Sequence, residues 1–105
     1  MNIINSDMGE YLEVGSVFLV YGINFSKGIT YCYIFNGDHL FEVPFELFEI
    51  IDPKVSELWS IKVRKNGDIT IWPELFYREN FFENFAEHET KERNEFYSLR
   101  RAMEQ

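Results

Sequence analysis

The chain has a single cysteine, and this scarcity excludes an internal disulfide. Cys32 lies in an apolar run between Tyr31 and Tyr33, with no neighbouring cation to lower the pKa of its thiol. A free cysteine in such a run is usually a small buried hydrophobe. We therefore expect Cys32 to pack in the core of a protein that resides in the cytoplasm.

The motifs of metal sites and of common catalytic sites are also missing. His39 and His88 are far apart, so they offer no short-spaced ligand pair for zinc. No glycine-rich turn leads to Lys-Ser or Lys-Thr at a helix start, and no serine has the G-x-S-x-G context. Glu46, Glu49 and Asp52 could line one side of a helical turn as acid and base or as a cation site, but acids at this spacing more often form a solvated face. We expect no metal and no cofactor, and the sequence favours a binding protein over an enzyme.

Long hydrophobic runs are absent. No stretch approaches the roughly eighteen apolar residues of a membrane helix. The first ten residues contain neither a basic residue nor an apolar run, so they do not resemble a secretion signal. A length of 105 residues supports one hydrophobic core and not two. We expect a single α+β domain over 1–105, with fraying within about 1–10 and 100–105.

Basic residues are few, since 10 Lys and Arg stand against 18 Asp and Glu and leave a net charge of −8. The segment 36–59 carries −5, whereas 60–72 carries +2. Nucleic acids and anionic membranes attract basic surfaces, so neither is an expected partner. A basic protein partner is electrostatically easier, although negative charge also keeps an aromatic-rich chain soluble.

What the sequence does contain is a series of β-branched and aromatic segments. They predict strands over 12–21, 29–35 and 39–43 and in both arms of a hairpin over 60–72. The turn formers of 22–28 predict a turn, and Asn36-Gly37-Asp38 predicts a hairpin turn between the second and third strands. The expected architecture is a bent antiparallel sheet or small open barrel of about five strands, followed by two C-terminal helices.

The hairpin over 60–72 allows its register to be argued. A two-residue Asn66-Gly67 loop would mix apolar and charged side chains on both faces. A three-residue loop that starts at Lys65, with Gly67 in a left-handed conformation, separates them. We predict the second loop, which sets Ile61 opposite Ile71, Val63 opposite Ile69 and Arg64 opposite Asp68.

Helical structure is expected in the connection and after the sheet. Pro44 suits the first position of a short helix through Glu49, and Asp52-Pro53 suits the start of a second helical turn. Pro73-Glu74 predicts the start of a longer helix. The apolar half of this helix is expected to pack on the sheet, and its residues are Leu75, Tyr77, Phe81, Phe82, Phe85 and Ala86.

Two details of these helices are open to test. Arg78 falls within the aromatic arc of the first helix, so it either reaches solvent along the rings or meets an acid. In the second helix a narrow apolar stripe is predicted, with Glu89 four residues before Arg93 as a surface pair. The stripe consists of Phe96, Leu99 and Met103.

Two groups of residues are candidate partner-binding surfaces. Tyr31, Tyr33 and Phe35 alternate along one strand, where they form a second core layer if helices cover them and a protein-binding patch if helices do not. The acidic connection surrounds aromatic anchors with carboxylates, an arrangement suited to a basic protein. Its acids are Glu42, Glu46, Glu49, Asp52 and Glu57, and its aromatic residues are Phe45, Phe48 and Trp59.

The leading hypothesis is a non-enzymatic cytoplasmic protein-interaction module, such as an immunity-type or antitoxin-type inhibitor of a basic protein. Its expected partner-binding residues are Tyr31, Tyr33, Phe35, Glu46, Phe48, Glu49, Asp52 and Trp59. The alternative is a small-ligand-binding domain or enzyme with a pocket between the sheet and the helix starting at Pro73. Tyr77 and Arg78 are the first candidates to line that pocket.

Overall fold

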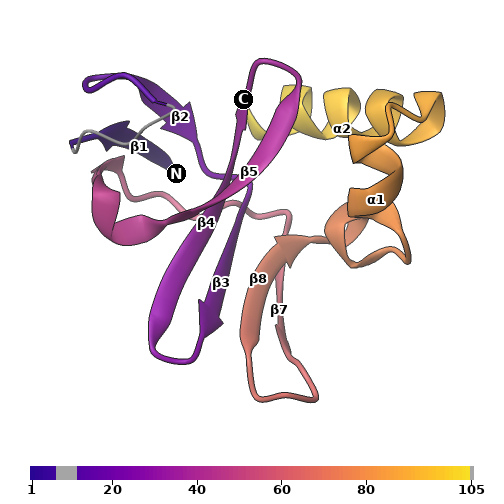
Figure 1. Ribbon diagram of the computed structural model, residues 1–105, viewed down its shortest axis with the longest axis horizontal. Coiled ribbons are helices and arrows are strands. Elements are labelled where there is room, and N and C mark those ends of the chain that lie inside the picture. Colours follow the sequence, from indigo (N-terminus) through magenta and orange to yellow (C-terminus); the bar gives the residue numbers. More distant parts are fainter. Residues whose placement is uncertain (7–11, 105) are drawn as a thin grey trace.

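The computed structural model describes residues 1–6 and 12–104, which form two antiparallel sheets and two C-terminal helices (Figure 1). The small sheet has the order β2-β1-β6, with β1 (Asn2–Asn5), β2 (Val17–Leu19) and β6 (Phe48–Asp52). The large sheet has the order β5-β4-β3-β8-β7, with β3 (Gly22–Ser26), β4 (Ile29–Asn36), β5 (His39–Pro44), β7 (Trp59–Val63) and β8 (Ile69–Pro73). The helical elements are the 3₁₀ turns η1 (Phe45–Leu47) and η2 (Glu74–Tyr77) and the helices α1 (Phe81–Ala86) and α2 (Thr90–Met103).

The predicted α+β class with two C-terminal helices is confirmed, and the antiparallel sheets are open and do not close into a barrel. One of the five strands of the large sheet was expected to be a turn. Gly22–Ser26 forms the central strand β3, and the turn shrinks to Lys27 and Gly28, both with positive φ. A Cβ at Gly22 would lie 2.8 Å from Cδ1 of Trp72, so glycine serves here to admit the indole ring.

The N-terminal part contains shorter strands than expected. The strand predicted over 12–21 is limited to Val17–Leu19, because Gly15 has a φ of +90° and its N–H bonds the carbonyl of Asn5. Asn2–Asn5 forms β1 and pairs on both sides, with β2 and β6. The expectation of fraying over 7–10 lies outside the described residues, and the last described turn of α2 extends to Met103.

The connection 44–59 is less helical than predicted. Pro44 precedes a single 3₁₀ turn, and the chain then pairs with β1 as β6. The prediction of a helical turn at Asp52-Pro53 is wrong. Asp52 ends β6, and its carboxylate accepts a hydrogen bond from the N–H of Lys54 in a local turn. Within β6, Ile50 lies opposite Ile3 and Asp52 opposite Asn2, so Ile51 has no opposite residue and forms a β-bulge.

The register of the β7–β8 hairpin is as predicted. Ile61 pairs with Ile71 and Val63 with Ile69. The N–H of Arg64 bonds the carbonyl of Asp68 at 2.7 Å. Gly67 takes the left-handed position with a φ of +92°. The alternation of apolar and charged residues therefore selects the bulged three-residue loop.

The helix predicted to start at Pro73 is broken in two. The 3₁₀ turn η2 ends at Tyr77, and Asn80 has a φ of +60° before α1 begins at Phe81. In a continuous helix, Phe76 and Phe85 would point about 180° apart. The break lets both rings enter one core, where each is 2% exposed.

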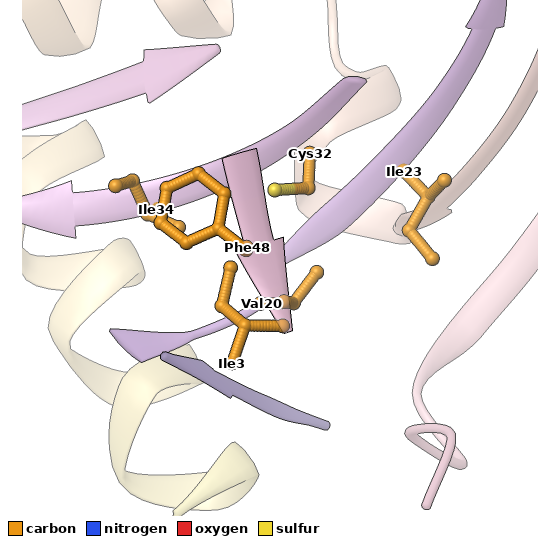
Figure 2. Packing of buried hydrophobic residues seen from close by; sticks show 6 residues of the cluster. All are labelled: Ile3, Val20, Ile23, Cys32, Ile34 and Phe48. Carbon is orange, nitrogen blue, oxygen red and sulfur yellow. The ribbon is translucent and has the colours of Figure 1, made fainter. Parts of the chain in front are cut away.

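Strand β4 lies between two layers of the hydrophobic core. Cys32 and Ile34 face the small sheet, and Figure 2 shows Phe48 of β6 against this side of the strand. Tyr33 and Phe35 face the helices. Tyr33 stacks on Phe82 with ring centroids 5.0 Å apart. The aromatic row of this strand is therefore a second core layer at these two positions.

Burial of Cys32 predicts a loss of stability in alkali. Burial raises the pKa of its thiol from 9.0 to about 12, and the charge of Glu42 adds to the rise. The folded state thus favours the protonated thiol, and the free energy of unfolding should fall as pH rises from 9 towards 12. We expect the urea midpoint to fall over this range in wild type and to fall less steeply in Cys32→Ala. Equal slopes of the urea midpoint against pH in the two proteins would contradict a contribution from this thiol. Burial also raises the pKa of Tyr21 to about 12, so this phenol accounts for part of the slope that remains in Cys32→Ala.

Candidate functional site

The aromatic residues expected to bind a partner are largely used inside the fold. Phe48 is 7% exposed and belongs to the core beneath the small sheet. Trp59 is half-buried, and its indole N–H bonds the carbonyl of Tyr21 at 3.0 Å. Tyr33 and Phe35 lie under the helices. These four side chains stabilise the fold and are poorly placed to serve as surface anchors.

Tyr31 is the remaining member of the predicted aromatic row. It is half-buried and lies opposite Asn24 on β3 and Pro44 on β5. Along β4 it is nearer than Tyr33 and Phe35 to the β3–β4 turn at Lys27 and Gly28. Figure 1 shows this turn away from α2. The structure therefore does not gather the three aromatic side chains into one exposed patch.

The acidic residues, in contrast, lie on the surface. Glu46 on η1 and Glu49 and Asp52 on β6 are all exposed. Within residues 1–6 and 12–104, the ion pairs are Arg78–Glu95 and Arg100–Glu104, so none of these three carboxylates has a cationic side chain as partner. Their negative charge is available to an approaching molecule.

Two isoleucines lie between Glu49 and Asp52 and are exposed at the surface. Ile50 is 49% exposed and Ile51 is 52% exposed. The β-bulge in β6 and its outer position in the small sheet account for both. Two adjacent apolar residues in a strand point to opposite faces, which is a signal that one of them lies outside the core. We call Glu46, Glu49, Ile50, Ile51 and Asp52 the acidic edge.

The acidic edge leads into a hollow of about 730 Å³, in which Asp52 is a lining residue. The hollow lies between the start of β1, the loop after β6 and the end of α2. Its charged side chains are the carboxylates of Asp52, Glu57 and Glu104, the last paired with Arg100, and the ammonium of Lys54; Met1 lies in the lining as well. Exposed apolar side chains are present as well, and they include Val55 and Leu58. We call this concavity the acidic hollow.

A second concavity of about 680 Å³ lies over the β7–β8 hairpin and the neighbouring strands, with Phe82 of α1 at its side, and its lining does not include Tyr77 or Arg78 of the pocket in the alternative hypothesis. Lys62, Arg64 and Lys65 supply its cations, Asp68 supplies one carboxylate, and Trp72 and Phe82 supply aromatic walls. We call it the basic cleft. Its charge is opposite in sign to that of the acidic hollow.

Neither residue first assigned to that pocket is available as a ligand group. The Tyr77 hydroxyl lies 2.8 Å from both the Ser60 carbonyl and Thr70 Oγ1, so it fixes η2 to the sheet. Arg78 forms a two-pronged pair with Glu95 of α2, which is one of the two arrangements predicted for it. The hydrogen bond from Arg78 lowers the pKa of Glu95. Both residues stabilise the packing of the helical segments.

The floor of the basic cleft is held by a polar network. The indole N–H of Trp72 bonds Asn24 Oδ1 at 2.6 Å, and the Asn24 amide donates to Glu42. Burial, followed by the charge of Glu42, raises the pKa of the Tyr33 phenol, so this hydroxyl stays protonated at neutral pH. The network orients the aromatic walls and leaves the cations at the rim.

The described residues provide no evident metal centre or membrane segment. In this part of the chain, no group of three or more His, Cys, Asp and Glu side chains is placed to hold a metal ion. No helix among those same residues is long and apolar enough to cross a bilayer. No family model, curated protein or solved structure matches this chain, and its candidate sites therefore rest on the geometry described above.

Proposed function

We propose that the protein is a non-enzymatic interaction module that binds a basic protein through the acidic edge and the acidic hollow. An inhibitor of the immunity or antitoxin type, which neutralises a basic partner in the cytoplasm, is the class that fits this proposal. The observation that carries it is the pairing of exposed Ile50 and Ile51 with the uncompensated carboxylates of Glu49 and Asp52 on one outer strand.

The chemistry of this surface suits capture of a cationic segment. Carboxylates on the rim steer a basic molecule towards the surface and discriminate against acidic proteins. Apolar side chains at the centre then supply contact area that charge alone does not. The hollow offers Lys or Arg side chains of the partner a concave acidic site next to Asp52. Phe48 and Trp59 contribute by holding β6 and the following loop in place.

Charge reversal on β6 tests the proposal. Glu49→Lys with Asp52→Lys should weaken the complex with the physiological partner by about tenfold or more, because like charges then face a basic surface. The partner is first isolated by crosslinking to the wild-type protein at its native level. Binding of the purified pair is then measured by calorimetry at low and at physiological salt.

The matched control is Glu79→Lys with Glu87→Lys, which changes the net charge equally at exposed acids near α1. We expect a change of less than about twofold for this pair, since the Debye length is about 8 Å at physiological salt. If both pairs of substitutions weakened binding equally, the net charge of the protein, and not this particular surface, would account for the loss of affinity. Unchanged affinity after reversal at Glu49 and Asp52 would contradict the proposal outright.

A further inference from the structure

The β7–β8 hairpin exposes a sheet edge whose two faces differ in chemistry. β7 is one of the two outermost strands of the large sheet, and Figure 1 shows the hairpin extending away from the small sheet. Among the described residues, no strand pairs with its outer side. This edge lies apart from the acidic edge, so a ligand bound to it is independent of the proposed function.

The backbone groups available on this edge can be assigned from the hairpin register. The N–H of Arg64 bonds Asp68 of the hairpin, so in the antiparallel alternation Lys62 and Arg64 direct their backbone groups towards β8. Ile61 and Val63 direct theirs outwards. The N–H of Trp59, which also points outwards, is bonded to the Ser56 carbonyl. Ile61 and Val63 therefore present donors and acceptors to an added strand.

One face of the edge is apolar. Phe25 lies opposite Ile69, which lies opposite Val63, so the three side chains form a row across β3, β8 and β7. Ile61 continues this face along β7. The exposed fractions are 40% for Phe25, 69% for Ile61, 73% for Val63 and 38% for Ile69. We call these four residues the apolar stripe.

The opposite face of the same edge is cationic. Lys62 Nζ lies 4.1 Å from the centroid of the Tyr77 ring, and the Arg64 guanidinium lies 5.5 Å from that of Trp72. Both line the basic cleft together with Lys65. In the described residues no carboxylate forms an ion pair with these cations. The ring contacts position the charges and leave them without an anionic partner.

These observations define one occupant. We propose that the free edge of β7 is a strand-addition site for an extended acidic segment of another protein, in which apolar and acidic residues alternate. Successive side chains of an added strand point to opposite faces, so one set contacts the apolar stripe and the other meets Lys62 and Arg64. The charge also disfavours β7 of a second copy, because its cations would face those of the first.

Amide hydrogen exchange tests the site directly. The probe is a short synthetic peptide of alternating glutamate and valine with blocked ends, added to the full chain. We expect the exchange of the Ile61 and Val63 amides to slow by about tenfold or more, while the Lys62 amide, already bonded within the hairpin, changes little. A permuted peptide of the same composition without alternation, and the alternating peptide with an N-methyl group on every residue, which blocks both edges of the strand, should have no such effect.

A paired substitution tests the charge requirement. Lys62→Glu with Arg64→Glu should reduce peptide affinity by about tenfold or more, and Lys91→Glu with Arg101→Glu on α2 should change it by less than about twofold. If the Lys62→Glu, Arg64→Glu variant does not fold, the comparison of the alternating peptide with the control peptides on the wild-type chain still tests the proposal. Unaltered exchange at Ile61 and Val63 with the alternating peptide, or equal protection by the permuted peptide, would overturn the proposal.

Discussion

Phe96→Ala is expected to destabilise the protein by about 3–5 kcal/mol. The side chain is fully buried, and its ring centroid lies 5.0 Å from those of Tyr21, Phe35 and Phe85. Its removal leaves a cavity between α2, α1 and the large sheet. Since a domain of this kind is stable by about 5–15 kcal/mol, the loss is a large part of the total.

Urea unfolding followed by tryptophan fluorescence and far-ultraviolet circular dichroism measures this loss. Phe96→Leu keeps most of the apolar volume and should cost clearly less than the alanine variant. Tyr97→Ala removes a neighbouring ring that is only half-buried and provides a second comparison. A cost below about 1 kcal/mol for Phe96→Ala would mean that docking of α2 does not depend on this ring.

The best-predicted part of the fold is the part governed by local rules. The β7–β8 register is determined by side-chain alternation and by a turn whose chemistry is contained within Lys65-Asn66-Gly67. The β4–β5 hairpin, with its turn at Gly37 and Asp38, is predictable for the same reason. In both cases the residues that set the pairing lie within a few positions of one another.

The missed elements depend on contacts between distant segments. Gly22 has the composition of a turn but lies in a strand, because Trp72 packs against its backbone. β6 pairs with a strand more than forty residues earlier in the chain. The break before α1 is required because Phe76 and Phe85 enter the same core. No local propensity contains this information.

The residues of the candidate site also fall into a group whose exposure the sequence predicts and a group whose exposure depends on contacts between distant segments. Exposure of Glu46, Glu49 and Asp52 could be predicted, since carboxylates are seldom buried without a partner. The exposure of Ile50 and Ile51 required knowledge of the bulge opposite Asn2 and Ile3. Burial of Phe48 and partial burial of Tyr33 and Phe35 depend on two layers that cover opposite faces of β4, and the sequence alone does not define the small sheet.

Arg93 is the clearest difference between the sequence interpretation and the structure. The i, i+4 spacing to Glu89 predicts an exposed ion pair, but Arg93 is 7% exposed. Its guanidinium lies 3.8 Å from the centroid of the Phe85 ring. Nη1 donates to the carbonyl of Asp38 and Nη2 to that of Phe85, each at 2.7 Å. One side chain thereby joins α2, the end of α1 and the β4–β5 turn.

Arg93→Ala is expected to cost about 3 kcal/mol, because two carbonyls lose a charged donor and the ring of Phe85 loses its covering cation. Among the described residues Nε of Arg93 is buried without a hydrogen-bond partner, and this offsetting cost keeps the expected value from being larger. Arg93→Met, which retains apolar volume, should lose most of the same stability, whereas Arg93→Lys should lose less because an ammonium can keep one of the two bonds.

Urea unfolding of the three variants, with exposed Arg101→Ala as the control expected to change stability by less than about 0.5 kcal/mol, separates the polar contribution from the packing contribution. If Arg93→Met proves as stable as the wild type, the two carbonyl bonds contribute nothing net, and the residue acts through its contact with Phe85. A loss in Arg93→Met close to that in Arg93→Ala instead assigns the joining of the three segments to the guanidinium, as its geometry predicts.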